Sequence, residues 1–293
     1  MIVPFAAGGP TDTIALIIAD GMRKFLGQAV VTENVTGAAG TVAIGRLAQA
    51  RPDGYTVGIG HWSTNVLNGA IYALPYDLLS DLAPIALIVS NPQVIIAKKA
   101  MPANDLSEMI AWLKVNPDKA LEGTAGTGSP SHIAGVYFQN RTGTRFQFVP
   151  YRGGAPAVRA LLAGQMDLGF EQAANVLAHV RAGEVKAFAV TGRDRLAAAP
   201  QIPTVEEAGL PGFHISVWHG LWAPAATPRE VINKLNSALV NALSEVTVRQ
   251  RLADLGQDIP PPKQQTPEAL AAFQKAEIEK WWPIIKAANI RAD

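Results

Sequence analysis

The sequence predicts an α/β protein built on a mostly parallel sheet, and three observations indicate this class. Short apolar segments of strand length alternate with longer segments whose apolar residues recur at helical spacing. Glycine-rich turns separate several of these strands from the helices that follow them. The chain has 293 residues, which is enough for a large core and for two domains.

Composition narrows the classes of function. Hydrophobic residues make up 48% of the chain and charged residues 17%, as in a globular protein and unlike a disordered one. A net charge of +1 without any basic block argues against nucleic acid as a partner. The absence of cysteine excludes disulfides, thiolate metal sites and a cysteine nucleophile. No apolar run has the length of a membrane span, and Met1 leads straight into a strand, so we expect no signal peptide in this chain.

The first elements are a strand at residues 2–5, a glycine turn and a helix. Gly8 and Gly9 allow backbone angles that other residues avoid, and they let a ligand approach the main chain. Thr11 or Asp12 is expected to cap the helix, and Gly27 to end it. A strand, a glycine turn and a helix start together form an anion site, because free N–H groups and the positive end of the helix dipole face one point.

The same arrangement is expected again in the first part of the chain. A strand at residues 29–32 precedes a second glycine-rich helix entry at residues 36–41. A third strand at residues 55–59 leads to a turn where Ser63 or Thr64 can cap another helix. Strands at residues 85–89 and 94–97 follow without a long helix between them.

A second unit opens with a helix at residues 106–115. A strand at residues 121–124 leads through Gly126 and Thr127 into a helix near residues 134–140. Residues 149–156 then resemble the opening stretch, with valine, proline and an aromatic residue before a glycine pair. A strand at residues 167–171 enters a helix near Asn175, and another strand covers residues 185–191. Helices at residues 229–243 and 267–288 close the chain.

Several catalytic and cofactor motifs are incomplete or missing. Two glycine pairs begin like a dinucleotide fingerprint, but Ser63 and Ser131 replace the third glycine, and no phosphate-binding loop is present. The five histidines lack metal-ligand spacing, and no nucleophile elbow surrounds Ser129. What is left is a set of uncharged donors at helix starts, which suits holding an anion better than transforming it. We therefore expect no metal and no cofactor.

Four residues have two open interpretations. His132 is either a helix-surface or capping residue or a ligand contact. Glu171 ends an apolar strand, where a carboxylate is costly to bury without a partner, so it is either a solvated loop acid or a binding residue. Trp62 and Trp218 stand beside turns, where each either packs in the core or lines a cleft.

The chain resembles the tripartite tricarboxylate transporter receptors, often called Bug proteins. The likeness runs from Val3 to about Ile290, in order and at the family's spacing. The matching motifs are Val3-Pro4-Phe5 with Gly8, Gly9 and Asp12; Pro52-Asp53-Gly54-Tyr55; Leu74-Pro75-Tyr76-Asp77; Val149-Pro150-Tyr151-Arg152-Gly153; Gly164-Gln165-Met166-Asp167; Ile202-Pro203-Thr204-Val205; Glu207-Ala208-Gly209-Leu210-Pro211-Gly212; and Gly220-Leu221-Trp222-Ala223-Pro224.

This resemblance implies a periplasmic-binding-protein-like fold, type II-like, in which two α/β domains close on a ligand in the cleft between them. Domain 1 would comprise residues 1–99 and 222–293, and domain 2 residues 100–221. The residues expected to contact the ligand are Phe5, Ala6, Gly8, Gly9, Thr11, Asp12, Trp62, Ser63, Thr64, Gly126, Thr127, Ser129, His132, Gly153, Glu171, Gln172 and Trp218.

The resemblance also implies a function in transport. The protein would capture a small organic acid in the periplasm, a di- or tricarboxylate or an aromatic acid, and pass it to the membrane permease subunits of the transporter. An enzyme on the same fold, using Ser129, His132 and Glu171, is the alternative, and a regulatory binding protein is a third. The chain departs from the family at Ala7, Trp62 and Glu171, so the identity of the acid is not carried over from relatives.

Overall fold

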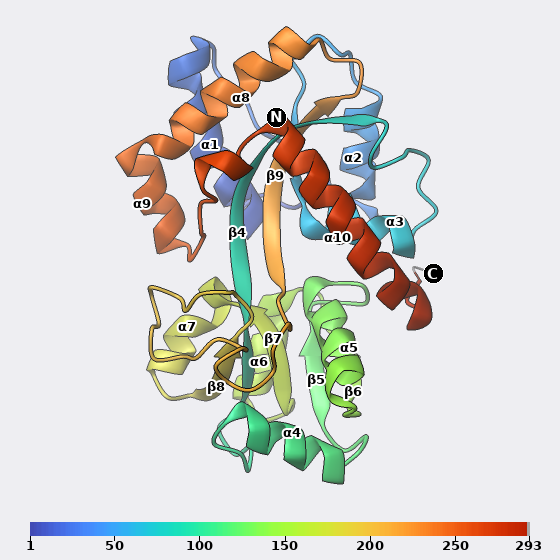
Figure 1. Ribbon diagram of the computed structural model, residues 1–293, viewed down its shortest axis with the longest axis vertical. Coiled ribbons are helices and arrows are strands. Elements are labelled where there is room, and N and C mark those ends of the chain that lie inside the picture. Colours follow the sequence, from blue (N-terminus) through green and yellow to red (C-terminus); the bar gives the residue numbers. More distant parts are fainter. Residues whose placement is uncertain (292–293) are drawn as a thin grey trace. The chain divides into compact units, whose positions relative to one another are not determined.

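A computed structural model describes residues 1–291 of the chain, which forms two compact units. Unit 1 comprises Met1–Ser90 and Trp218–Asp293, and unit 2 comprises Asn91–Val217. Two strands, β4 (Leu82–Lys98) and β9 (Ser216–Pro224), carry the chain from one unit into the other (Figure 1). The expected domain bounds lie in or next to these same strands, and the division into domains that move stays a prediction.

Unit 1 is an α/β unit assembled from both ends of the chain. Besides its parts of β4 and β9, its strands are β1 (Ile2–Val3), β2 (Glu33–Asn34) and β3 (Gly58–His61). Its helices are α1 (Pro10–Leu26), α2 (Thr41–Ala48), α3 (Asn68–Ile71), α8 (Arg229–Ser244), α9 (Val246–Asp254) and α10 (Pro267–Ala287), with short helical turns η1 (Ala38–Gly40), η2 (Ser63–Leu67) and η3 (Pro262–Gln264).

The sheet of unit 1 has the strand order β2-β1-β3-β9-β4. Strands β1, β2 and β3 are parallel, so their carboxyl ends lie at one edge. Strand β9 runs antiparallel to β3 and pairs His61 with His219. Loops that follow the first three strands therefore gather at a single edge, as in other open α/β sheets.

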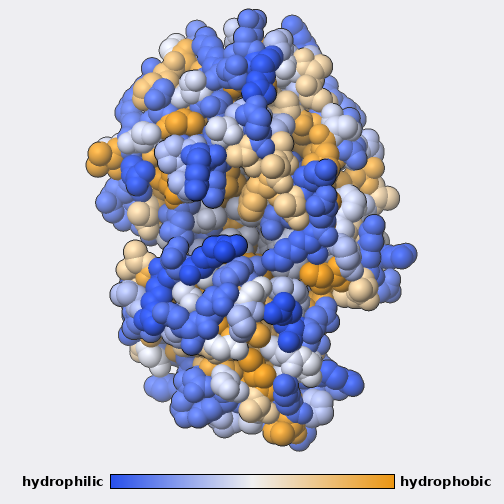
Figure 2. Space-filling view, in the orientation of Figure 1, coloured by the Kyte–Doolittle hydropathy of each residue, from blue (hydrophilic) through white to orange (hydrophobic). Residues whose placement is uncertain are grey.

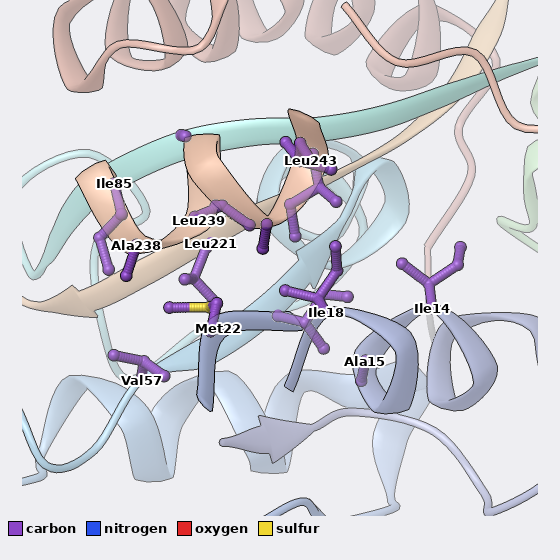
Figure 3. Close-up of a cluster of buried hydrophobic side chains, with 14 of the residues drawn as sticks. Ile14, Ala15, Ile18, Met22, Val57, Ile85, Leu221, Ala238, Leu239 and Leu243 are labelled. Carbon is purple, nitrogen blue, oxygen red and sulfur yellow. The ribbon is translucent and has the colours of Figure 1, made fainter. Parts of the chain in front are cut away.

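The main core of unit 1 lies between this sheet and helices α1 and α8. Ile14, Ile18 and Met22 line one face of α1 at helical spacing, and none is more than marginally exposed. Leu239 of α8 and Leu221 of β9 belong to the same buried cluster, and Figure 3 shows these side chains lying together. At about 25 cal/mol per Å² of apolar surface, burial of a side chain such as isoleucine stabilises the fold by about 1.5–3 kcal/mol.

Helix α10 brings a group of tryptophans together in unit 1. Trp62 meets Trp281 of α10 in an edge-to-face contact with ring centroids 5.0 Å apart. Trp218 and Trp222 lie side by side along β9, and Trp218 donates a hydrogen bond to Glu277 of α10. This helix therefore fixes the segment that follows β3.

Unit 2 is a continuous α/β unit. Besides its parts of β4 and β9, it contains strands β5 (Leu121–Thr124), β6 (Gln147–Pro150), β7 (Leu168–Gln172) and β8 (Val185–Val190). Its helices are α4 (Leu106–Val115), α5 (Pro130–Thr142), α6 (Gly154–Leu162) and α7 (Ala173–Arg181).

In unit 2 the strands are ordered β8-β4-β7-β5-β6, with β5, β6 and β7 mutually parallel. One face carries an apolar cluster that includes Val158 of α6 and Val176 of α7. The other carries Phe138 of α5, which contacts Phe170 and Phe213. The carboxyl ends of β5, β6 and β7 thus share one edge, held from both faces.

The predicted elements are mostly confirmed, with several local differences. The strand expected at residues 55–59 is Gly58–His61, and Trp62, not Ser63 or Thr64, is the N-cap of the helical turn that follows. Strand β9 and helix α9 were not predicted. The strand expected at residues 29–32 is shifted to Glu33–Asn34, because β1 offers only Ile2 and Val3 as partners. The two strands expected at residues 85–89 and 94–97 form one strand, β4, because Ser90 and Gln93 continue to bond to other segments. The first helix begins at Pro10 with Gly9 as its cap, so neither Thr11 nor Asp12 caps it.

Hydrophilic and apolar residues are intermixed on the part of each unit's surface that Figure 2 shows. Some large apolar side chains are exposed, among them Val31, Tyr55 and Val246, as on most protein surfaces. Among residues 1–291, no helix combines the length and the apolar character needed to cross a membrane.

Candidate ligand-binding sites

The predicted site residues fall into two groups, one in each unit. The unit 1 group lies where β1, β2 and β3 end, and comprises Phe5, Ala6, Gly8, Gly9, Thr11, Asp12, Trp62, Ser63, Thr64 and Trp218. The unit 2 group lies where β5, β6 and β7 end, and comprises Gly126, Thr127, Ser129, His132, Gly153, Glu171 and Gln172.

In unit 1, Asp12 holds the glycine turn in place. Its buried carboxylate accepts a hydrogen bond from the main-chain N–H of Gly8 at 2.8 Å and another from the Asn34 side chain at 2.8 Å. Asn34 also donates to the carbonyl of Phe5, and the N–H of Gly9 to the carbonyl of Ala6. Both carboxylate oxygens of Asp12 are therefore engaged inside the protein.

The turn leaves the start of α1 open. Gly8 has a left-handed φ of 78°, and a side chain there would meet no atom within 4 Å. Pro10 has no N–H, and the N–H groups of the first turn of a helix have no partner within the helix. Thr11 and Asp12 therefore direct their N–H groups toward the open end, which is favourable for an anion.

Two histidines complete this end of unit 1. His61 makes edge-to-face contacts with the ring of Phe5, at a centroid distance of 5.4 Å, and with His219, at 4.9 Å. Nε2 of His219 lies 3.0 Å from the hydroxyl of Thr11. Burial lowers the pKa of His61 to about 4. Burial also lowers the pKa of His219 well below its usual value, and the nearby His61 makes a smaller contribution in the same direction. Both rings are therefore neutral at pH 7.

The tautomer of His61 follows from its neighbours. Its Nδ1 accepts a hydrogen bond from the main-chain N–H of Ser63 at 3.1 Å and lies 2.7 Å from the Ser63 hydroxyl. A neutral ring that accepts at Nδ1 carries its proton on Nε2. Among the described residues Nε2 has no hydrogen-bond partner, so His61 offers a neutral N–H beside Phe5 and the start of α1.

The remaining unit 1 residues have structural contacts. Ser63 and Thr64 lie within the helical turn η2, and the Thr64 hydroxyl accepts the N–H of His61 at 2.8 Å. Trp62 and Trp218 are fully buried against residues of α10. Of the two interpretations left open by the sequence, the contacts show core packing for both tryptophans, and a ligand contact stays a prediction.

In unit 2, main-chain hydrogen bonds join the loops after β5 and β6. Gly153 donates its N–H to the carbonyl of Ala125, and Tyr151 donates to that of Thr124. Gly153 caps α6 with a φ of 107°, and a side chain there would meet no atom within 4 Å. Gly126 also has a positive φ, and Thr127 beside it is exposed. The starts of α5 and α6 are thus neighbours with open space before α6.

Helix α5 begins with a set of reciprocal contacts. Ser129 is the N-cap, and its side chain accepts the N–H of His132. Nδ1 of His132 accepts the N–H of Gly128 at 3.0 Å, so the proton of the neutral ring lies on Nε2. Burial lowers the pKa of His132. His132 is therefore a neutral donor that also stabilises the loop. These contacts are consistent with a capping role, and a ligand contact stays a prediction.

Glu171 is the one carboxylate of the predicted set in unit 2. It is buried, its Oε2 accepts a hydrogen bond from Asn175 at 3.1 Å, and its Oε1 makes no hydrogen bond among the described residues. Burial raises its pKa to about 7, a change that Asn175 and the nearby N–H of Gln172 partly offset. Gln172 itself caps the start of α7. The solvated interpretation of Glu171 is therefore wrong.

A second buried acid, Glu122 of β5, escaped the sequence analysis. Neither of its oxygens makes a hydrogen bond among the described residues. Gly135 of α5 leaves the space for it, because a Cβ at that position would lie within bonding distance of Oε2. Burial, with a smaller contribution from Glu171, raises its pKa well above the usual value. Burial therefore favours the protonated form of Glu122.

Other features do not compete with these sites. A surface groove of about 820 Å³ in unit 1 is lined by Met1, Val31, Arg46 and Tyr55 among others, and by none of the predicted site residues. It adjoins the amino end of β1 and the start of α2, where Thr41 is among its lining residues. Within residues 1–291, no cluster of three or more His, Asp or Glu side chains could hold a metal ion.

The arrangement of strands, helices and glycine turns is that of the periplasmic binding proteins. The solved structure of MatC from Rhodopseudomonas palustris with bound malate is 39% identical, with a TM-score of 0.84, and covers 97% of each chain. The periplasmic binding protein BugD is 37% identical, with a TM-score of 0.84, over 100% of this chain and 98% of its own. Rpa4515 of R. palustris with adipate is 29% identical, with a TM-score of 0.86, over 99% and 97%.

The family follows from the sequence as well. The profile of the tripartite tricarboxylate transporter family receptor matches residues 14–290. The chain therefore belongs to this family of solute-binding receptors, and the resemblance stated from the motifs is confirmed. The family and its structural neighbours are receptors and not enzymes. The enzyme alternative is accordingly set aside.

The structure adds three residues to the unit 1 group that the sequence analysis missed. Asn34 and His61 are the last residues of β2 and β3, and His219 is paired with His61 across the sheet. A polar residue at the carboxyl end of a parallel strand is a usable signal for the first two. His219 could not be found in this way, because its place depends on a strand pairing distant in sequence.

Proposed function

We propose that this protein is a periplasmic receptor that binds a small organic acid and delivers it to the membrane subunits of a tripartite tricarboxylate-type transporter. The observation that carries the proposal is the start of α1. There, a turn held by Asp12 presents main-chain N–H groups to open space. Membership of the receptor family supports the transport role.

The proposed contact is a carboxylate at the unit 1 turn. The N–H groups of Thr11 and Asp12 would bind its oxygens, and Nε2–H of His61 would donate a further hydrogen bond. Hydrogen bonds to a charged acceptor are roughly twice as strong as neutral ones, so neutral donors are adequate. The half-buried Phe5 would supply an apolar wall.

The ligand class is a di- or tricarboxylate or an aromatic acid. MatC and Rpa4515 were solved with malate and adipate, two acids that each carry two carboxyl groups, and this supports the first alternative. Unit 2 would contribute Thr127, Ser129 and His132 as donors, with Gly126 and Gly153 allowing close approach. No metal or nucleotide would take part.

The experiment is a thermal-shift screen of organic acids, each paired with its neutral amide. Ligand at about one hundred times its dissociation constant stabilises the folded state by roughly 2.7 kcal/mol. We expect stabilisation by an acid and none by its amide. Equal stabilisation by both members of a pair would contradict recognition of a carboxylate.

Gly9→Val tests the place of binding. A Cβ at Gly9 would lie 3.3 Å from the carbonyl of Ala6, so the larger side chain fits at a modest cost but covers the start of α1. We expect the acid-dependent shift to be lost. Gly27→Ala at the other end of the same helix is the matched control, because its φ of 66° makes alanine strained without touching the turn. It should lower the melting temperature and keep the shift.

A further inference from the structure

The acidic residues of the two candidate sites, Asp12 and Glu171, differ in how fully their carboxylate oxygens are hydrogen-bonded. In unit 1 both carboxylate oxygens of Asp12 are engaged by Gly8 and Asn34. In unit 2 the Oε2 of Glu171 accepts a hydrogen bond from Asn175, and its Oε1 has no hydrogen-bond partner among the described residues. A buried carboxylate oxygen without a donor is costly, since burial removes the water that would otherwise bind it. Glu171 therefore lacks one partner.

The carboxylate of Glu171 lies against the start of α6. Both carboxylate oxygens face Gly154, where a Cβ would lie 2.8 Å from Oε2 and 3.2 Å from Oε1. The residue before it, Gly153, has no atom within 4 Å of the place of a side chain. A group that reaches the start of α6 therefore comes beside Glu171.

The negative charge of Glu171 determines which ligand groups can bind beside it. A helix start attracts an anion when its N–H groups are free, as at α1, where both oxygens of Asp12 are already engaged by Gly8 and Asn34. At α6 and α7 the carboxylate of Glu171 already occupies that role, next to the N-caps Gly153 and Gln172. A second carboxylate would be repelled by it, whereas an O–H or N–H group would fill the vacant acceptor.

We propose that Glu171 is the specificity residue of unit 2, and that its Oε1 accepts a hydrogen bond from a hydroxyl or amino group of the ligand. This inference rests on the proposed function, since it concerns a second group of the same organic acid. It narrows the ligand class to acids that carry a donor besides their carboxylates. Plain dicarboxylates and unsubstituted aromatic acids are bound more weakly.

The test uses three acids with one carbon skeleton: succinate, L-malate and L-aspartate, which carry hydrogen, hydroxyl and ammonium at the same carbon. Affinities are measured by calorimetry at pH 8, where most of Glu171 is ionised because its pKa is about 7. Wild-type protein should bind malate or aspartate at least tenfold more tightly than succinate. A preference for malate indicates a hydroxyl, and one for aspartate an amine.

Two substitutions separate the role of Glu171 from a loss of folding. Glu171→Met removes the acceptor at similar volume, so malate, aspartate and succinate should bind within a factor of three of one another. Glu171→Gln keeps a neutral acceptor, so it should lose preference for aspartate more than for malate. Glu122→Gln changes a second buried acid, which is not among the predicted ligand contacts, and it should leave the preference unchanged.

The outcomes distinguish this inference from the proposed function. If wild-type protein binds succinate as tightly as malate and aspartate, Glu171 has a structural role or holds water, and the inference is overturned. A preference for succinate that grows as the pH falls would also overturn it, because a protonated Glu171 would then receive a carboxylate. Malamide and succinamide test the donor without any carboxylate. If malamide alone stabilises the wild type and fails with Glu171→Met, the inference stands and carboxylate recognition falls. If no compound stabilises any variant, both fall.

Discussion

The imidazole rings of His61 and His219 meet edge to face across the β3–β9 ladder, with their centroids 4.9 Å apart. Neither ring has an acid as hydrogen-bond partner; one bonds to Ser63 and the other to Thr11. Both rings are neutral and lie at the carboxyl edge of the sheet. They therefore provide unit 1 with hydrogen-bond donors that do not titrate near neutral pH. This property has a consequence for stability in acid.

We expect stability to fall as the pH is lowered from 6.5 to about 4. The folded-state pKa of His61 is about 4, whereas the unfolded chain takes up the proton near pH 6.5. Between these two pH values the unfolded state binds more protons than the folded state. Each such histidine therefore lowers the free energy of unfolding by about 1.4 kcal/mol for every pH unit of acidification. Urea unfolding at pH 7 and pH 5 should show a smaller loss for His61→Asn than for the wild type. An equal loss in both proteins would contradict this assignment.

Glu122 should produce the opposite dependence. Its folded-state pKa is raised well above 4.5, so the unfolded chain releases the proton first as the pH rises. Stability due to this group is complete below pH 4.5 and declines above it. Glu122→Gln keeps the shape without the titrating proton, so it should be close to neutral at pH 4.5 and stabilising at pH 8. A variant less stable than the wild type at pH 8 would show that the acid has a partner there.

Asp12→Asn should weaken both the fold and ligand binding. The carboxylate of Asp12 accepts from the N–H of Gly8 and from the side-chain amide of Asn34. In the asparagine variant one of these two donors would face the new NH₂ group instead of an oxygen. A buried donor left without an acceptor costs about 1–3 kcal/mol. Denaturant unfolding measures this loss, and the acid-dependent thermal shift should shrink. Asp20→Asn is the control, since this residue lies on the same helix with an exposed side chain.

Chelation should have no effect on binding. The described residues offer no cluster of metal ligands, and the proposed contacts are main-chain N–H groups, hydroxyls and neutral imidazoles. The acid-dependent thermal shift should be the same before and after treatment with a chelator. A shift that disappears, and that a divalent ion restores, would rule out the metal-free proposal.

The sequence predicted what depends on local pattern. The first helix and its glycine C-cap at Gly27 depend on local pattern, and both are confirmed. The motifs also led to the family, which the matched profile confirms. Helix caps were less predictable, because a glycine before Pro10 can cap as a threonine does.

Features that depend on pairing could not be predicted in the same way. The length of β2 is set by its partner β1, and His219 reaches Thr11 only because β9 pairs with β3. Glu122 falls in the strand expected at residues 121–124, and only the missing side chain of Gly135 explains its burial. Such contacts join residues that are distant in sequence, so local spacing does not predict them.

The way unit 1 is assembled has a consequence for the order in which the chain folds during synthesis. Strand β3 pairs with β9, and Trp62 packs on Trp281, so the first part of the chain waits for the last. Contacts between residues far apart in sequence form slowly, because the intervening loop must close first. Unit 2 is continuous and has no such delay. The apolar face of α1 is therefore synthesised early and covered late, and it is the segment of the nascent chain that most needs protection from aggregation.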